Sequence, residues 1–183
     1  MEVTAIVFSC ILYALSLVLL GWRQIASPCC SFLGLLIMSL AKTSDGYPLL
    51  PINSSMIFGW LCVTVLVTVV TLLQPRSVRD TSRGVWYMTG GAIVGLAIGL
   101  LGFTVSSAVG AMYAIMIICV AVGTFFGYLL YTGTPGGKGV ALSSGHFFNY
   151  FLAKGFPVAV TIMQGGVVLV LVIAINSLVN YVQ

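Results

Sequence analysis

Ser143, Ser144 and His146 are the closest pairing of nucleophiles and a base in the sequence. A serine hydroxyl becomes a useful nucleophile when a histidine accepts its proton and a third group orients that histidine. The chain of 183 residues has only three carboxylates, and none is near this group in sequence: Glu2, Asp45 and Asp80. Acid–base catalysis therefore has no evident third partner, and we predict that the protein is not an enzyme.

The segment GTPGGKG at residues 133–139 is similar in composition to a phosphate-binding loop. Such a loop needs a fixed spacing between its first glycine and its glycine–lysine pair, followed by serine or threonine. Here the spacing is one residue short, and Gly139 stands where the hydroxyl residue is needed. We predict a flexible loop in which Lys138 contacts lipid headgroups.

A metal or redox site has few candidate ligands in this chain. His146 is the only histidine, and the five cysteines are scattered: Cys10, Cys29, Cys30, Cys62 and Cys119. A protein-bound zinc ion takes three or four ligands, so no metal and no cofactor is expected. The adjacent pair Cys29 and Cys30 lacks the spacing of a metal or thioredoxin-type motif, which leaves a redox role as a weak alternative.

The composition indicates that lipid is the solvent. Hydrophobic residues make up 60% of the chain and charged residues 5%, against about 25% charged in soluble domains. A basic patch with interleaved aromatic residues is absent from the sequence, so nucleic acid is not an expected partner. We predict one all-α, polytopic integral membrane domain over residues 1–183, with membrane lipids as its surroundings.

Six apolar segments are expected to build this domain, at residues 3–21, 29–41, 56–73, 85–103, 108–131 and 156–178. The second is short, because its 13 residues span about 20 Å as a helix, less than the roughly 30 Å hydrocarbon core. It either crosses with help or is re-entrant. Residues 141–155 are expected to lie along the interface or to extend the last segment. The first segment lacks a basic leader, so it is expected to be a retained span.

The basic residues predict the orientation. If all six segments cross, the loops on one side hold all but one of the basic residues: Arg23, Arg76, Arg79, Arg83, Lys138 and Lys154. The other side then holds only Lys42, and a re-entrant second segment would change the count to five against two. Because cytoplasmic loops are enriched in lysine and arginine, we place the basic loop with Arg76, Arg79 and Arg83 in the cytoplasm. Both termini are then on the non-cytoplasmic side of a bacterial inner membrane.

Glycines recur at four-residue spacing in the fourth and fifth segments. Gly91, Gly95 and Gly99 share one helix face, and small residues let helix backbones approach each other in lipid. The fifth segment carries its own set: Gly110, Gly123 and Gly127. We expect the two segments to form an antiparallel, glycine-packed hairpin. The alternative is that a glycine face meets a second subunit or a substrate.

Two stretches resemble a family of small bacterial membrane proteins called domain of unknown function four-five-six. They are SPCCSFLGLLIMSLAKTSDGYP and DTSRGVWYMTGGAIVGLAIGLLG. The matching positions are Pro28, Ser31, Gly34, Arg83, Gly84, Trp86, Gly91, Gly95 and Gly99. The resemblance implies a multi-spanning, glycine-packed inner-membrane protein and lends no activity.

Polar side chains inside the apolar segments give the functional hypothesis. Intramembrane polar groups face protein or a water-filled cavity, and Thr64, Thr68 and Thr71 share one face of the third segment. The residues of a candidate polar path are Gln164, Thr161, Thr68 and Asn176. The alternative role of Gln164 is an interhelical hydrogen bond worth roughly 0.6–2 kcal/mol.

These features favour a self-associating transporter- or channel-like protein for a small neutral or lipid-like solute. The alternative is a structural or accessory subunit within a larger membrane complex, and an intramembrane redox or lipid-modifying enzyme is a more distant third hypothesis. A wet cavity shared by Gln164 and residues 29–54 would favour transport. The same residues enclosed in dry helix contacts would favour the accessory role.

Overall fold

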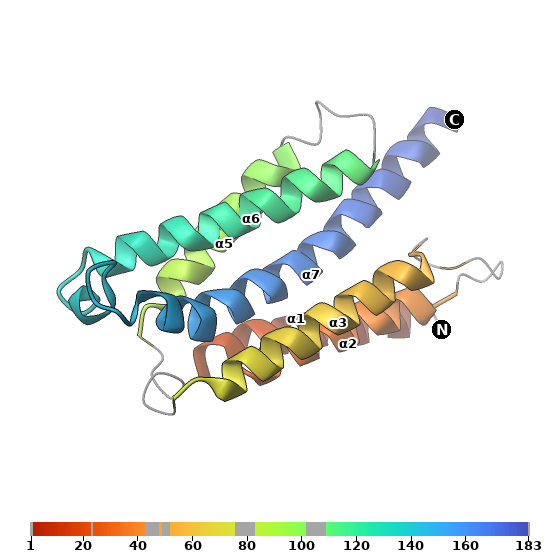
Figure 1. The fold of residues 1–183 in the computed structure, drawn as a ribbon. Coiled ribbons are helices and arrows are strands. Elements are labelled where there is room, and N and C mark those ends of the chain that lie inside the picture. Colours follow the sequence, from red (N-terminus) through yellow and green to blue (C-terminus); the bar gives the residue numbers. More distant parts are fainter. Residues whose placement is uncertain are drawn as a thin grey trace.

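The computed structural model describes residues 2–22, 24–42, 48, 52–75, 83–101 and 109–182. Side chains are described in these ranges except at residues 2–3, 109, 110, 112 and 172–182. The described residues form six α-helices (Figure 1): α1 (Glu2–Trp22), α2 (Ala26–Leu40), α3 (Ser54–Leu73), α5 (Val85–Leu101), α6 (Val109–Thr132) and α7 (Phe147–Val182). A short 3-10 helix, η2 (Lys138–Val140), lies between α6 and α7. The part of the chain that the structure describes contains no strand, so the prediction of an all-α fold is confirmed.

Proline and backbone chemistry set several helix ends. Pro28 lies in the first turn of α2, where its missing N–H has no intrahelical partner to lose. Pro75 follows α3, and Gln74 before it is extended with ψ of 147°, because a residue preceding proline is pushed out of the helical region. In α7, Pro157 lies inside a continuous helix, so this proline does not end it.

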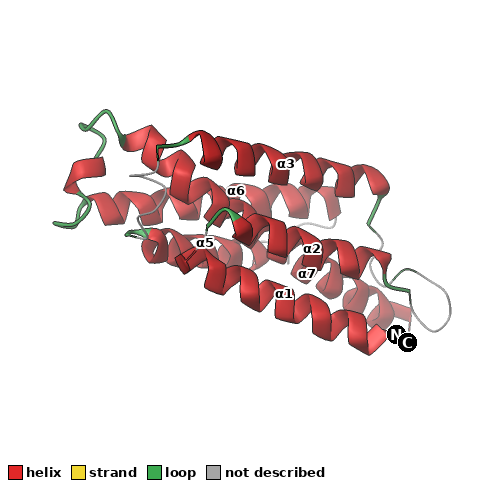
Figure 2. Ribbon diagram, turned by 90° about the horizontal axis from the view of Figure 1, so that it is seen from below, coloured by secondary structure: helices red, strands yellow, loops and turns green. Residues whose placement is uncertain are grey.

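Consecutive helices run in opposite directions. In the α1–α2 pair, Ser9 donates a hydrogen bond to the Gly34 carbonyl at 3.1 Å and Ser27 donates one to the Ser16 carbonyl at 2.8 Å. Residue numbers that rise on one helix and fall on the other define an antiparallel pair. The α2 helix therefore runs back to the end of the bundle where α1 begins, as Figure 1 also shows. Both chain termini lie at this same end (Figure 2).

The α7 helix is the centre of the bundle. It contacts α1, α2, α3, α5 and α6, and 78% of the most apolar 18 residues within Phe147–Leu171 are buried. The corresponding values for Thr4–Trp22, Ser54–Leu73 and Tyr113–Thr132 are 17%, 22% and 28%. In Figure 1 α7 passes between the α5–α6 pair and the group of α1, α2 and α3. The structure extends the last apolar segment back from 156 to Phe147. Of the stretch 141–155, residues 147–155 therefore extend that segment, whereas residues 141–146 form turns and bends before it.

The outer helix faces are apolar. Phe8, Val18, Phe58, Val94 and Ile118 are each at least half exposed. Among the described residues, four helices are long and apolar enough to cross a membrane: those containing Thr4–Trp22, Ser54–Leu73, Tyr113–Thr132 and Phe147–Leu171. The apolar helices α2 and α5 are shorter, at 15 and 17 residues.

Candidate functional site

Gln164 is the centre of a buried polar contact among α2, α3 and α7, which we call the Gln164 junction (Ser31, Thr64 and Gln164). The Ser31 hydroxyl donates a hydrogen bond to Oε1 of Gln164. Nε2 of Gln164 donates to Oγ1 of Thr64 at 2.8 Å, and Thr64 in turn donates to the Trp60 carbonyl at 2.7 Å. The amide side chain therefore ties α7 to two other helices at once.

A second polar contact lies about one turn away. Ser27 Oγ is 2.8 Å from the Ser16 carbonyl oxygen and 3.0 Å from Oγ1 of Thr161. A serine hydroxyl has one proton and a carbonyl oxygen can only accept, so Ser27 donates to Ser16 and Thr161 donates to Ser27. This chain of bonds joins α7 through α2 to α1.

Both contacts are closed to solvent. Gln164, Ser27 and Ser31 are 0% exposed, Thr161 is 2% exposed and Thr64 is 4% exposed. An unpaired buried polar group costs about 1–3 kcal/mol, and the bonds described above satisfy these hydroxyls and both ends of the amide. The arrangement is therefore that of a dry helix–helix contact in this conformation.

The other predicted polar-path residues are placed differently. Thr68 donates to the Thr64 carbonyl in its own helix at 2.8 Å. Its oxygen also lies 3.7 Å from the sulfur of Cys29, whose thiol donates to the Ile25 carbonyl at 3.9 Å. Gln164, Thr161 and Thr68 thus lie along neighbouring turns where α7, α2 and α3 meet, whereas the side chain of Asn176 is outside the described residues.

The α5–α6 pair makes contact through backbone. A Cβ atom built on Gly91 would lie 2.2 Å from the Gly123 carbonyl oxygen, and one on Gly95 would lie 2.2 Å from the Cys119 carbonyl oxygen. A Cβ on Gly127 would lie 2.3 Å from the Tyr87 carbonyl oxygen. No side chain fits at these positions, so the two helices occupy each other's glycine faces.

The surroundings of the remaining two glycines, Gly99 and Gly110, are described to different extents. A Cβ on Gly99 would lie 2.9 Å from the Met116 Cα. Gly110 lies within α6, but its surroundings are outside the described residues. On the α7 side, Gly166 faces Leu96 and the Met116 sulfur, so this part of α7 meets the α5–α6 hairpin through apolar side chains.

A tyrosine cluster, which the sequence reasoning did not anticipate, fixes the loop that follows α6. The hydroxyl of Tyr128 lies 2.8 Å from the Val140 carbonyl oxygen and 3.0 Å from that of Phe147. The ring of Tyr150 stacks on those of Tyr128 and Tyr131, with centroids 6.0 and 6.1 Å apart. The Tyr150 hydroxyl donates to the Arg83 carbonyl. These tyrosines thus hold both chain segments at this end of the bundle.

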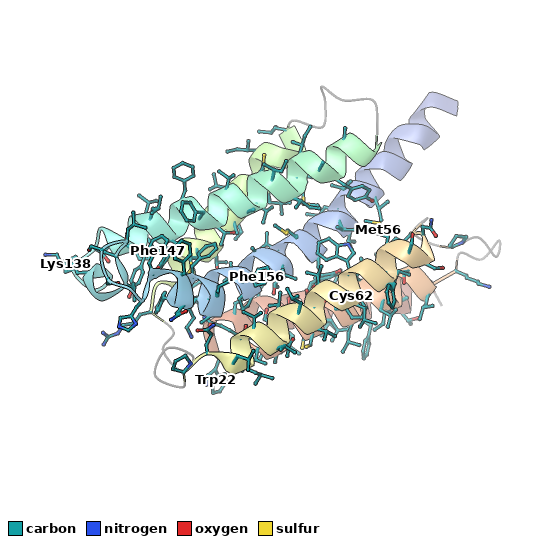
Figure 3. All side chains as sticks on the ribbon, viewed as in Figure 1. Trp22, Met56, Cys62, Lys138, Phe147 and Phe156 are labelled. Carbon is teal, nitrogen blue, oxygen red and sulfur yellow. The ribbon has the colours of Figure 1, made fainter. Side chains whose placement is uncertain are left out.

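The loop itself is a series of hydrogen-bonded turns rather than the flexible segment that its glycines predicted. The Gly137 amide donates to the Thr134 carbonyl at 3.0 Å, and the Val140 amide donates to Gly137 at 3.0 Å. Tyr131 donates to the Gly136 carbonyl at 3.1 Å. Lys138 projects at the far end of the bundle from the two termini (Figure 3).

The residues first considered for chemistry are not assembled into a site. His146 is exposed, and Ser144 donates its hydroxyl proton to the Ala141 carbonyl at 2.8 Å. Over the described ranges, no three His, Cys, Asp or Glu side chains come together as metal ligands, and Cys29 and Cys30 are free thiols. Asp45, Asp80, Arg76 and Arg79 lie outside the described residues, whereas Arg83 is described and exposed.

Two observations on the buried residues were missed by sequence reasoning. Ser27 and Ser31 are four residues apart on α2 and were not recognised as the partners of α7, although that spacing places them on one helix face. Lys154, predicted to belong to the basic loops, is only 1% exposed and lies within α7.

No protein-family model matches the chain, and no curated protein or solved structure is significantly similar to it.

Proposed function

We propose that the protein is an integral membrane protein of the bacterial inner membrane in which all six helices cross. The apolar outer faces of α1, α3, α5 and α6 support this proposal, because lipid tails are the solvent that such faces prefer. The 15 residues of α2 reach about 22 Å. Its antiparallel pairing with α1 supports a crossing rather than a re-entrant path.

The orientation follows from the alternating helix directions. The helix ends between α1 and α2, between α3 and α5 and between α6 and α7 lie at one end of the bundle, and in the sequence Arg23, Arg76, Arg79, Arg83 and Lys138 fall between these helices. Lys154, near the start of α7, belongs to the same end, and Lys42 lies at the other. The six-to-one distribution supports a cytoplasmic basic end. We also propose that the chain is related to the family called domain of unknown function four-five-six, which its sequence resembles.

The orientation predicts the result of reporter fusions. A fusion of alkaline phosphatase after Gln183 is expected to be active, and a fusion of green fluorescent protein there is expected to be dark, because both report a non-cytoplasmic C-terminus. Insertion of the same reporters at Gly139 should give the opposite pair of signals. A fluorescent C-terminal fusion together with an inactive phosphatase fusion would contradict the proposed orientation.

Within the membrane we propose a structural or accessory role, in which the chain packs against a larger assembly through its outer faces. The Gln164 junction carries this proposal. Its polar groups are satisfied by helix contacts and closed to solvent, which is the arrangement expected of a packing element. The glycine faces of α5 and α6 already pack against each other within the chain, at Gly91, Gly95, Gly123 and Gly127. A second copy would therefore have to bind elsewhere.

The second candidate is a transporter for a small neutral solute. It is favoured by the line of polar side chains formed by Thr161, Gln164 and Thr68 where α7 meets α2 and α3. A movement of α7 away from α3 would open these groups to water. Transport therefore requires a second conformation, whereas the accessory role requires only the conformation described.

Proteoliposomes distinguish the two candidates. Purified protein reconstituted in lipid is expected to leave the rate of reswelling in glycerol, urea and neutral sugars equal to that of protein-free vesicles, because the polar groups are closed. Vesicles with a reconstituted glycerol channel provide the positive control. Selective reswelling in one solute, abolished by Gln164→Leu, would contradict the accessory role and support transport.

A further inference from the structure

An apolar groove lies between the beginning of α1 and the end of α2. Its volume is about 600 Å³, and its lining includes Ala5, Phe8, Ile37, Leu40, Ala41 and Lys42. This volume lies within the roughly 300–1,000 Å³ typical of small-molecule sites. All of these residues belong to described parts of the chain, at the end that also holds both termini.

The groove follows from the side chains at this end of the helix pair. The bond from Ser9 to the Gly34 carbonyl holds α1 close to α2. Nearer the end of the pair, the lining includes two small residues, Ala5 one turn before Ser9 on α1 and Ala41 directly after α2. Phe8 and Leu40, which are 60% and 69% exposed, form the walls instead of closing the groove.

Lys42 adds a positive charge to the lining of the groove. Lys42 comes directly after the last turn of α2, which the Ala41 amide closes by donating to the Ile37 carbonyl at 3.0 Å. Lys42 is exposed. In the proposed topology it is the one lysine or arginine on the non-cytoplasmic side, where basic residues are disfavoured. A cation kept at this position, beside an apolar groove, matches an amphiphile with an anionic head.

We infer that the groove binds an anionic phospholipid, with one acyl chain lying along Phe8, Ile37 and Leu40 and the headgroup phosphate on the Lys42 ammonium. The apolar walls supply contact area for the chain, and the ammonium supplies a point charge for the phosphate. This inference rests on the proposed membrane location. It assigns to the non-cytoplasmic end of the α1–α2 pair a lipid site that is separate from the Gln164 junction.

Native mass spectrometry of the purified full chain tests the inference. The protein in detergent is mixed with equal amounts of phosphatidylglycerol and phosphatidylcholine that carry the same acyl chains. We expect about five-fold more phosphatidylglycerol adduct, since a lysine near an anionic lipid surface is worth about 1 kcal/mol. Lys42→Gln should abolish this preference, and Arg83→Gln, which removes an exposed cation at the opposite end, should keep it.

Filling the groove tests the acyl-chain part. Ala5→Phe, and independently Ala41→Leu, should reduce the adducts of both lipids while the thermal midpoint in detergent stays near that of the wild type. The second variant serves if the first does not fold. Persistence of the phosphatidylglycerol preference in Lys42→Gln, or undiminished adducts in the filled variants, would overturn the lipid site. Either result leaves the reporter-fusion outcome, and therefore the proposed membrane location, unaffected.

Discussion

Gly95→Leu is expected to separate α5 from α6 and to remove most of the folded protein from a detergent extract. The Cβ atom alone would lie 2.2 Å from the Cys119 carbonyl oxygen and 3.1 Å from the Val120 Cα. Because these are backbone atoms, neither can move aside without displacing a whole helix. Overpacking ordinarily destabilises a protein by about 1–3 kcal/mol. Because the clashing atoms are backbone atoms, we expect a loss of stability at or above the upper end of this range.

The measurement is the midpoint of thermal aggregation of the purified protein, followed by size-exclusion chromatography. We expect the midpoint to fall by about 6–12 °C, which corresponds to about 3 kcal/mol in a chain of this size, or the monodisperse peak to disappear. Gly90→Leu is the matched control, because a Cβ at Gly90 meets nothing within 4 Å. Equal midpoints for the Gly95 and Gly90 variants would show that the α5–α6 contact described here is wrong.

Gln164→Leu is expected to loosen α7 from α2 and α3. The substitution removes the acceptor of the Ser31 hydroxyl and the donor to Thr64. Interhelical hydrogen bonds in membranes contribute roughly 0.6–2 kcal/mol each, so the loss of two should cost about 1–4 kcal/mol. The free energy of unfolding in mixed micelles, titrated with a denaturing detergent, measures this loss.

Controls separate the junction from a general effect of apolar substitution. Thr68→Val removes a hydroxyl that donates within its own helix, and we expect a change within about 0.5 kcal/mol. A double-mutant cycle of Ser31→Ala with Gln164→Leu should give a coupling of about 0.5–2 kcal/mol, because the two side chains share a bond. Strict additivity of these two substitutions would contradict a direct contact.

Much of the helical framework could be predicted from the sequence because apolar runs specify helices locally. The expected segment 56–73 corresponds to α3, and 85–103 corresponds to α5, whose described part ends at Leu101. The beginning of α7 could not be placed in the same way. Residues 147–155, which follow His146, mix aromatic and polar residues, and Pro157 resembles a helix boundary. The helix is nevertheless continuous there, because α7 is buried against five other helices.

The hydrogen-bond partners of Gln164 could be identified only from the tertiary structure. Gln164 stood out because an amide in an apolar run needs a partner, but Ser31 and Thr64 are 133 and 100 residues away in sequence. A pattern among neighbouring residues in the sequence cannot predict contacts between residues so far apart. Tyr128 and Tyr150 were missed for a related reason, because a tyrosine near the end of an apolar segment is equally typical of a membrane interface.

The account depends most on the claim that the polar side chains of Thr161 and Gln164 on α7 are hydrogen-bonded to neighbouring helices and closed to solvent. Thiol accessibility of Thr161→Cys tests it in a background without native cysteines, because a thiol is close in size to the hydroxyl it replaces. Lys42→Cys and Lys138→Cys serve as exposed references at the two ends. A membrane-impermeant, water-soluble maleimide should modify each reference from its own side and leave position 161 unmodified from both. Rapid modification of position 161 in the folded protein would contradict the sealed core and favour a solute path along α7.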